Sequence, residues 1–510
     1  MFLITSAAYI NSDLESEFGK IPSSFLPIQN KRLFEHQIKL IGKNEIYISI
    51  PDCYTVSEGD KYFFNKNNVK LVYIKKDITL GESVVDVLKK IGKIQDDLFI
   101  LHGDTLFSSL PSETDIFSLS RTFDNYNWDR HNNKENLIYN GFFSFSDQKE
   151  LIRCIENQNF DFISGIKKYS TLINVKSIEK SDWFDCGHAN TYYRSKTFFT
   201  TQREFNELKI NSYTVTKTSR DNKKIKAELN WIKQIPAELK KFAPNLISEG
   251  ITNNKNFYEI EFYPYSNLSE IYVFGNNKVY VWEMILNRIK EFINESYKLS
   301  NHNIEFDSNK VNDILFSKTV KRIKEYSKIT GINLNQDWII NGMKVPSINN
   351  IINDLKDKIE APRKEDYKVI HGDLCFSNVL FSFRNQIIKL IDPRGIGSDG
   401  EITIYGDIRY DLSKLSHSVV GLYDYIIADR YSYEEINDYN IKFKIHENSS
   451  TKSIQDVFLK MELFGNPIKD YNILEIQILL FLSMIPLHSD KPERQKAFLA
   501  NALLLFNKLQ

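Results

Sequence analysis

The sequence lacks features that define several classes of protein, namely a net charge and paired cysteines. Lys plus Arg and Asp plus Glu each number 66, so the 510-residue chain carries no net charge. A protein that binds nucleic acid or an anionic membrane surface depends on an excess of basic residues, so this balance argues against both classes. The four cysteines form no C-x-x-C pair. We therefore expect neither a zinc site nor a disulfide framework, and a reducing cytoplasm fits.

Long apolar runs are also missing. The most apolar late segment, residues 473–487, is too short to span a bilayer and carries Glu475 and Gln477, so it indicates a core helix. The first ten residues are apolar but have no basic n-region, which predicts a buried strand and no targeting signal. Hydrophobic residues make up 42% of the chain, enough for sizeable cores in two to four domains.

The first 200 residues alternate short apolar runs with helical patterns. The runs suited to buried parallel strands are residues 2–7, 45–50, 69–74 and 97–102. Helical spacing lies between them, as in residues 33–41 and 83–91. This βαβ pattern predicts a doubly wound sheet, in which polar ligands bind beyond the carboxyl ends of the strands. Asp104 lies at such an end.

A second pattern begins at about residue 211. Residues 193–210 indicate a polar, helix-like connector. Strands are then predicted at 212–219 and 257–265, on either side of an amphipathic helix at 224–233. From 278 to 360 the pattern is mostly helical, and helices are expected after the loop at 369–395 to the end of the sequence.

The stretch V-I-H-G-D-L-C-F-S-N-V-L-F at 369–381, followed by K-L-I-D-P-R-G at 389–395, carries groups suited to phosphoryl transfer. Asp373 could orient a hydroxyl and take its proton, while Asn378 and Asp392 could hold magnesium on a nucleotide. Transferring a phosphoryl group requires mainly positioning and charge neutralisation, which these groups supply.

These motifs resemble the aminoglycoside phosphotransferase and choline kinase superfamily, which has the protein-kinase fold. The resemblance covers about 211–510. It implies that Asp373 is the catalytic base, that Asn378 and Asp392 are Mg²⁺ ligands, and that Asp411 braces the catalytic loop. The resemblance also implies ATP as the phosphate donor.

The ATP side of that site is expected from two charged residues. Lys217 lies in the strand T-V-T-K-T, eleven residues before Glu228 on the next helix. A carboxylate at Glu228 would hold the ammonium of Lys217 against the α- and β-phosphates. The alternative is two solvated surface charges. No glycine-rich loop precedes Lys217, so phosphate contacts are expected from backbone groups around 211–216.

His371 is expected to orient the loop at 369–395, and Arg394 either contacts a substrate phosphate or caps the loop.

The first half resembles the sugar-phosphate nucleotidyltransferases, including the phosphocholine cytidylyltransferase branch. The matching segments are L-P-I-Q-N-K-R-L-F-E-H-Q-I at 26–38, L-G-E-S-V-V-D-V-L at 80–88, F-I-L-H-G-D at 99–104, Y-N-G-F-F-S-F at 139–145 and D-W-F-D-C-G-H-A-N-T-Y-Y at 182–193. The resemblance implies that Asp104 and Asp185 hold Mg²⁺ on a nucleoside triphosphate, with Asp104 also assigned a catalytic role.

The sequence departs from this second family at its phosphate-binding loop. The family's G-x-G-x-R loop is absent, and the matching stretch at 8–20 contains only Gly19. Lys20 or Lys31 could take the place of the family's lysine, and Lys134 is a candidate for holding the acceptor phosphate.

Together the resemblances imply a bifunctional cytoplasmic enzyme of α/β class. A doubly wound, Rossmann-like (GT-A-type) nucleotidyltransferase domain is expected over 1–200 and a bilobal protein-kinase-like α+β domain over 201–510. The small lobe is expected at about 201–270 and the large lobe at about 271–510.

The expected enzyme phosphorylates a small hydroxylated metabolite (a sugar, polyol or amino alcohol) with ATP. It then joins the product to a second NTP, with CTP or UTP favoured, and releases pyrophosphate. Such activated units feed capsule or lipopolysaccharide synthesis, as the resemblance implies. Two alternatives stay open: a kinase with a non-catalytic, nucleotide-binding first half, and a resistance-type phosphotransferase acting on an antibiotic. No membrane span is expected, and the sequence does not predict the oligomeric state.

Overall fold

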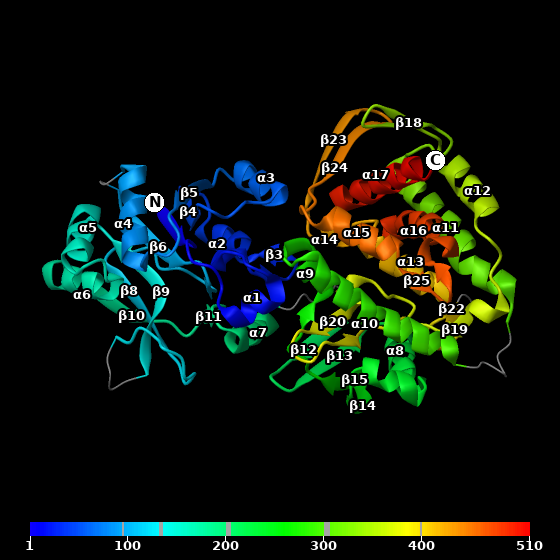
Figure 1. Ribbon diagram of the computed structural model, residues 1–510, viewed down its shortest axis with the longest axis horizontal. Helices are drawn as coiled ribbons and strands as arrows, with labels where there is room; N and C mark the ends of the chain where they lie inside the picture. Colours follow the sequence, from blue (N-terminus) through cyan, green and yellow to red (C-terminus); the bar gives the residue numbers. More distant parts are fainter. Residues whose placement is uncertain (94–95, 132–135, 200–205, 300–305, 398–399) are drawn as a thin grey trace. The chain divides into compact units, whose positions relative to one another are not determined.

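The computed structural model describes residues 1–93, 96–131, 136–199, 206–299, 306–397 and 400–510. The chain divides into two compact units (Figure 1). The first consists of Met1–Thr200 with Phe274–Asn276, and the second of Thr201–Val273 with Asn277–Gln510. None of the helices in these described ranges is both long and apolar enough to cross a membrane.

The first unit contains a seven-stranded sheet with the order β10-β8-β9-β6-β1-β4-β5. Its strands are β1 (Phe2–Thr5), β4 (Ile46–Pro51), β5 (Lys70–Ile74), β6 (Leu98–His102), β8 (Ile116–Arg121), β9 (Leu137–Phe145) and β10 (Lys176–Glu179). Strands β5, β4, β1 and β6 are parallel to one another, and β9 is antiparallel to β6 and β8. The four strands predicted from apolar runs are confirmed.

The order of the parallel strands creates a preferred ligand position. From β1 the chain passes to β4 and β5 on one side, then returns to β6 on the other side of β1. Such a reversal leaves a crevice beyond the carboxyl ends of the two central strands, where open α/β sheets bind ligands. Thr5 pairs with His102 in register at this edge, and Asp104 follows two residues later.

The connecting segments form short strands and helices whose apolar faces pack on the sheet. The short strands are β2 (Pro27–Ile28), β3 (Lys31–Arg32), β7 (Thr105–Phe107) and β11 (Trp183–Asp185); the helices are α1 (Ser12–Phe18), α2 (Leu33–Ile41), α3 (Glu58–Lys66), α4 (Leu80–Ile91), α5 (Gln148–Asn157), α6 (Phe162–Leu172) and α7 (Ala189–Phe198). Helix α4 shows the pattern clearly. Thr79 and Glu82 form a capping box at its start. Val84, Val87 and Leu88 are buried in the core of the first unit, and the second and third follow the first by three and four residues.

The second unit opens with an antiparallel sheet of order β12-β13-β15-β14. It comprises β12 (Asn206–Ile210), β13 (Thr214–Ser219), β14 (Leu246–Thr252) and β15 (Lys255–Glu261), with α8 (Asn222–Gln234) between β13 and β14. The prediction of a helix-like connector over 193–210 is wrong at 206–210. The Asn211 side chain accepts hydrogen bonds from the amides of Tyr213 and Thr214, which turns the chain and pairs β12 with β13.

Most of the remaining chain is helical. The helices are α9 (Leu268–Phe274), α10 (Val279–Lys298), α11 (Ser308–Thr330), α12 (Ile348–Lys358), α13 (Ile408–Val419), α14 (Tyr423–Ile427), α15 (Thr451–Leu459), α16 (Ile473–Met484) and α17 (Pro492–Leu509). The apolar segment predicted as a core helix is confirmed, because α16 lies in the main core cluster of this unit with Ile476, Leu479 and Leu482 buried.

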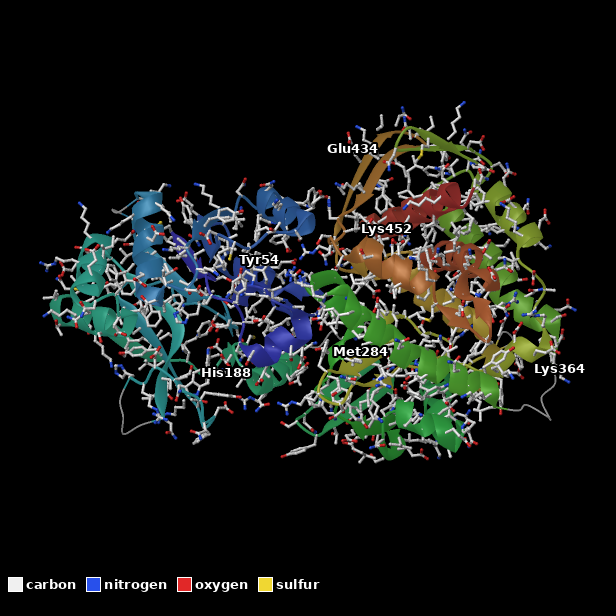
Figure 2. All side chains as sticks on the ribbon, viewed as in Figure 1. Tyr54, His188, Met284, Lys364, Glu434 and Lys452 are labelled. Atoms are coloured by element: carbon white, nitrogen blue, oxygen red, sulfur yellow. The ribbon has the colours of Figure 1, made fainter. Side chains whose placement is uncertain are left out.

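Several strands interrupt this helical part. They are β16 (Ser266–Asn267), β17 (Trp338–Ile340), β18 (Met343–Val345), β19 (Tyr367–Val369), β20 (Val379–Ser382), β21 (Ile387–Leu390), β22 (Tyr405–Asp407), β23 (Tyr431–Asn437), β24 (Asn440–Ile445), β25 (Glu462–Leu463) and β26 (Asn466–Pro467). The expectation of helices alone after the loop is therefore wrong at β23 and β24. Ile441 and Phe443 are buried while Lys442 and Lys444 are exposed, a period of two that indicates a strand; exposed Glu434 lies on the paired strand (Figure 2).

Gly81 in α4 offers a test of packing in the first unit. A Cβ atom there would lie 2.2 Å from the backbone carbonyl oxygen of Phe160. We expect Gly81→Ala to lower the free energy of unfolding of this unit by roughly 1–3 kcal/mol, because the clash outweighs the better helix propensity of alanine. Urea unfolding measures the change. Lys90→Ala, which removes an exposed pair with Asp86 on the same helix, is the control. Equal stability of the two variants would contradict the close approach.

Candidate active site

The loop that follows β19 is held by one buried carboxylate. Asp411, on α13, accepts hydrogen bonds from the backbone amides of His371 (2.6 Å) and Gly372 (2.8 Å). Burial raises the pKa of Asp411 to about 7, against the lowering effect of the two amides. Gly372 has a φ of 77°, a conformation that glycine adopts without strain. This is the bracing contact expected of Asp411.

His371 is fully buried beneath this loop. One ring nitrogen, Nε2, lies 3.0 Å from the carbonyl oxygen of Ile391, and Nδ1 accepts a hydrogen bond from the amide of Asp373. Burial lowers the pKa of His371 to about 4. The imidazole is therefore neutral near pH 7, with Nε2 as the donor. It links this loop to the segment that carries Asp392, which fits an orienting role.

Asp373 is kept ionised by its neighbours. Its Oδ1 lies 2.7 Å from the Nζ of Lys414, and its Oδ2 accepts a hydrogen bond from the side-chain amide of Asn378 at 3.0 Å. Burial alone would raise the pKa of Asp373, but the Lys414 ammonium overcomes this effect and lowers the pKa to about 2. Sequence reasoning missed Lys414. Its position on α13, three residues after Asp411, could have indicated that both side chains face the loop.

Lys217 is a buried cation between two carboxylates. Its Nζ lies 2.8 Å from Glu228 Oε2 and 2.8 Å from Asp392 Oδ1. The side chains of Lys217 and Glu228 are 2% and 1% exposed, so the alternative of two solvated surface charges is wrong. Tyr258 donates a further hydrogen bond to Glu228 at 2.8 Å. Although burial alone would lower it, the pKa of Lys217 is raised by the carboxylates of Asp392 and Glu228.

The groups around Asp392 fit a magnesium ion. The Asn378 amide nitrogen donates to both the backbone and side-chain oxygens of Asp373, which leaves the amide oxygen as the group for a cation. The Asp392 side chain is 45% exposed, and the backbone φ angle of this residue is 57°. Across the described residues, no three His, Cys, Asp or Glu side chains gather around a metal position. Mg²⁺ needs only one or two protein oxygens when phosphates supply the others.

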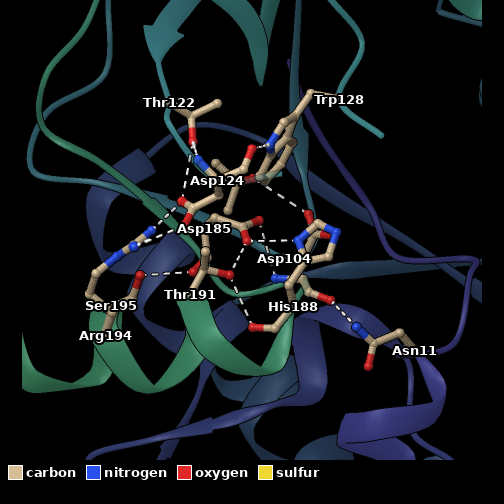
Figure 3. A network of polar contacts seen from close by, with 12 residues as sticks. Asn11, Asp104, Thr122, Asp124, Trp128, Asp185, His188, Thr191, Arg194 and Ser195 are labelled. Atoms are coloured by element: carbon tan, nitrogen blue, oxygen red, sulfur yellow. Dashed lines mark hydrogen bonds and ion pairs between the residues drawn. The ribbon is translucent and has the colours of Figure 1, made fainter. Parts of the chain in front are cut away.

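The structure also brings together the two predicted carboxylates of the first unit (Figure 3). Asp104 follows β6 and Asp185 ends β11, and the Cys186 amide donates to the Asp104 carbonyl at 2.8 Å. A Cβ atom on Gly187 would lie 2.6 Å from Asp104 Oδ2 and 3.4 Å from Asp185 Oδ1, so both carboxylates border one point. Burial, and then the charge of Asp185, raise the pKa of Asp104. Two carboxylate oxygens at one point fit a hard divalent cation.

Asp185 is held in position by its own segment. His188 Nδ1 lies 3.0 Å from Asp185 Oδ2, which also accepts a hydrogen bond from the Thr191 hydroxyl. The hydrogen bond to Asp185 raises the pKa of His188. The imidazole stacks on Tyr126 with 3.8 Å between ring centroids. Asn11 donates to the Gly187 carbonyl at 2.7 Å, which joins this segment to the start of α1.

Helix α1 occupies the stretch where the nucleotidyltransferase resemblance would place a glycine-rich loop. Asn11 caps it by accepting from the Leu14 amide, and Asp13 and Glu15 lie in its first turn. Lys20 lies 4.6 Å above the ring of Tyr9. Lys31 is exposed in β3, and Lys134 lies outside the described residues. The structure therefore offers no glycine-rich phosphate cradle between residues 8 and 20.

Comparisons with known proteins give distant likenesses. No family model matches the chain. The choline kinase LicA from Streptococcus pneumoniae is 13% identical over 61% of this chain and 92% of its own, with a TM-score of 0.34. An aminoglycoside-3'-phosphotransferase of type VIII is 13% identical over 60% and 94%, with a TM-score of 0.30. HddC from Yersinia pseudotuberculosis is 16% identical over 39% and 99%, also with a TM-score of 0.30. Because these TM-scores are low, we draw no functional conclusion from them.

The Lys414–Asp373 ion pair gives a testable pH dependence. Because the pKa of Asp373 is lowered to about 2, the pair stabilises the fold above pH 4 and loses this effect as the pH falls toward 2. We expect Lys414→Met to lower the free energy of unfolding by roughly 1–3 kcal/mol at pH 7, and by less at pH 3. Urea unfolding at the two pH values measures this.

Lys414→Arg, which keeps the cation, is the matched control and should lose less stability. An equal loss for Lys414→Met at both pH values would show that Asp373 does not depend on this partner.

Proposed function

We propose that the second unit is a small-molecule kinase that transfers the γ-phosphoryl group of ATP to a hydroxyl. The observation that carries this proposal is the position of Asp373. This ionised carboxylate lies on a braced loop in the same unit as the buried Lys217–Glu228 pair and the oxygen ligands Asn378 and Asp392. Phosphoryl transfer needs this combination of a positioned acceptor and neutralised phosphate charge.

Each residue then has a defined task. Asp373 orients the acceptor hydroxyl, whose oxygen attacks the γ-phosphorus; the bond to the bridging oxygen breaks, ADP leaves, and the hydroxyl proton passes to Asp373. Lys217 binds the α- and β-phosphate oxygens after exchanging part of its contact with Asp392. Magnesium, when bound by Asn378 and Asp392, would neutralise charge on the phosphates. Backbone groups of the β12–β13 turn, residues 211–213, lie in the segment expected to contact phosphate.

We further propose that the first unit transfers a nucleotidyl group to the phosphorylated product. The support is the pair Asp104 and Asp185, beyond the carboxyl end of β6 and next to the switch point of the sheet. A phosphate oxygen of the acceptor would attack the α-phosphorus of an NTP, CTP or UTP being favoured, and pyrophosphate would leave. The two reactions are consecutive and would yield an activated unit of the kind used in surface polysaccharide.

One observation favours a second interpretation of the function of the first unit. Helix α1, with Asp13 and Glu15 in its first turn, lies where a phosphate-cradling loop is expected. Acidic side chains near a triphosphate would weaken its binding. In that reading the first unit binds nucleotide without catalysis, and the chain is a kinase alone.

Reciprocal variants separate these functions. We expect Asp373→Asn to reduce acceptor phosphorylation by roughly 100-fold or more, because the proton acceptor is lost. The same variant should still release pyrophosphate when supplied with the phosphorylated acceptor and an NTP. Acceptor-dependent ADP formation and pyrophosphate release are measured separately.

Asp104→Asn should do the reverse and abolish pyrophosphate release while leaving phosphorylation unchanged. Gly187→Ala should behave similarly, because its Cβ would displace the Asp104 carboxylate. Pyrophosphate release that is absent from the unmodified protein with every NTP would favour the kinase-only reading. Loss of both activities in either folded Asp variant would contradict two separate sites.

A further inference from the structure

A cavity of about 560 Å³ lies beside the catalytic loop of the second unit. His371, Gly372, Arg394, Tyr410 and Leu315 are among its lining residues. The Arg394 amide donates to the His371 carbonyl at 2.9 Å, and a Cβ on Gly372 would lie 2.8 Å from Arg394 Cβ. The cavity thus adjoins the loop that presents Asp373, and its volume suits a small metabolite.

Arg394 lines the cavity, and α11 and α13 carry further cations on the helix faces of two other lining residues, Leu315 and Tyr410. On α11, Lys318 and Arg322 follow Leu315 by three and seven residues, so the three share one face of the helix. The Arg394 guanidinium lies 5.5 Å from the ring centroid of Tyr410. Lys414 follows Tyr410 by one turn of α13.

These cations repel one another. Burial, together with the charges of Arg394, Arg322 and Lys414, lowers the pKa of Lys318 to about 7, and Asp373 offsets only part of this effect. Burial and Arg394 also lower the pKa of Arg322, with Tyr410 and Glu325 opposing. Asp373 is already paired with Lys414. Asp373 and Glu325 are the carboxylates that oppose this repulsion, and an anionic ligand would relieve it further.

Two of the carboxylates that line the cavity, Asp407 and Asp307, have partners of their own. Asp407 is engaged by the Arg409 guanidinium at 2.6–3.1 Å. Asp307 caps α11 by accepting from the Asn309 amide.

Resting on the kinase function proposed above, we propose that the phosphate acceptor itself carries an anionic group, a phosphate or a carboxylate, which Lys318, Arg322 and Arg394 bind while its hydroxyl lies at Asp373. Arginine and lysine form strong charge-assisted hydrogen bonds with both groups. The same cations disfavour a cationic acceptor such as choline, ethanolamine or an aminoglycoside. The excess of positive charge thus selects among the sugars, polyols and amino alcohols considered from the sequence.

Matched acceptors test this inference. The full-length protein is titrated by calorimetry with three sets of acceptors. The first set is glucose and glucose 6-phosphate, the second is glycerol, glycerol 3-phosphate and glycerate, and the third is the cations choline and ethanolamine. Acceptor-dependent ADP formation is measured with the same compounds. We expect an anionic member to bind and to be phosphorylated in preference to its neutral partner, with no binding of choline or ethanolamine. The phosphorylated and carboxylated members show which anion the site takes.

Variants on α11 locate the site. We expect Lys318→Ala to weaken binding of the anionic acceptor roughly 10- to 100-fold, as for loss of a charge-assisted contact, with ATP affinity unchanged. Lys318→Arg should restore most of the affinity. Lys321→Ala and Lys324→Ala remove exposed lysines of the same helix and should leave the affinity for the anionic acceptor unchanged. Because Lys318→Ala also removes repulsion, its melting temperature should be equal to or above that of the unmodified protein.

The outcomes separate this inference from the kinase proposal. Binding of an anionic acceptor that depends on Lys318, without phosphorylation, would support the site and overturn the kinase function. Phosphorylation of neutral or cationic acceptors in preference to their anionic partners would keep the kinase and overturn the anionic acceptor. Acceptor affinities that do not change in Lys318→Ala would also overturn it.

Discussion

The proposed site of the second unit depends on a buried lysine between two carboxylates. Lys217 comes from β13, Glu228 from α8 and Asp392 from the segment after β21, up to 175 residues apart in the chain. A buried charge without its partners costs several kcal/mol, so strand, helix and loop must all be in place before any of the three is stable. Once Asp392 is fixed, His371 reaches the Ile391 carbonyl and the Arg394 amide reaches the His371 carbonyl. The position of Asp373 follows from that chain of contacts.

Much of the fold could be predicted from the sequence because its strongest patterns are local. The parallel strands of the first unit are short runs of Val, Ile, Leu and Phe, and α16 is apolar around its whole circumference. β12 could not be found, because N-E-L-K-I is short and polar and becomes a strand only by pairing with β13. The hairpin of β23 and β24 was missed, although β24 alternates apolar and polar residues at 440–445.

Residues of the candidate sites could be predicted where side chains suited to phosphoryl transfer lie close together in the sequence or at the end of a strand. Asp373, Asn378 and Asp392 lie within twenty residues, and Asp104 lies two residues after a predicted strand. Sequence alone could not show that Lys217 is buried or that Lys414 reaches Asp373, because both facts depend on tertiary packing. The cation cluster was invisible for the same reason. Lys318 and Arg322 belong to a helix without a recognisable motif, and Arg394 and Lys414 come from two other segments.

Both units place carboxylates where a cation could bind and neutralise phosphate groups. In the second unit Lys217 supplies part of the positive charge, whereas Asp104 and Asp185 lie together with His188 beside them. The most direct test is mass spectrometry of products formed from ATP, Mg²⁺, each of CTP, UTP, GTP and dTTP, and a pool of sugars, polyols, amino alcohols and their phosphates. The account predicts an acceptor with one added phosphate, followed by its nucleotidyl conjugate. A pool left without any added phosphate, whichever nucleotide is supplied, would contradict it.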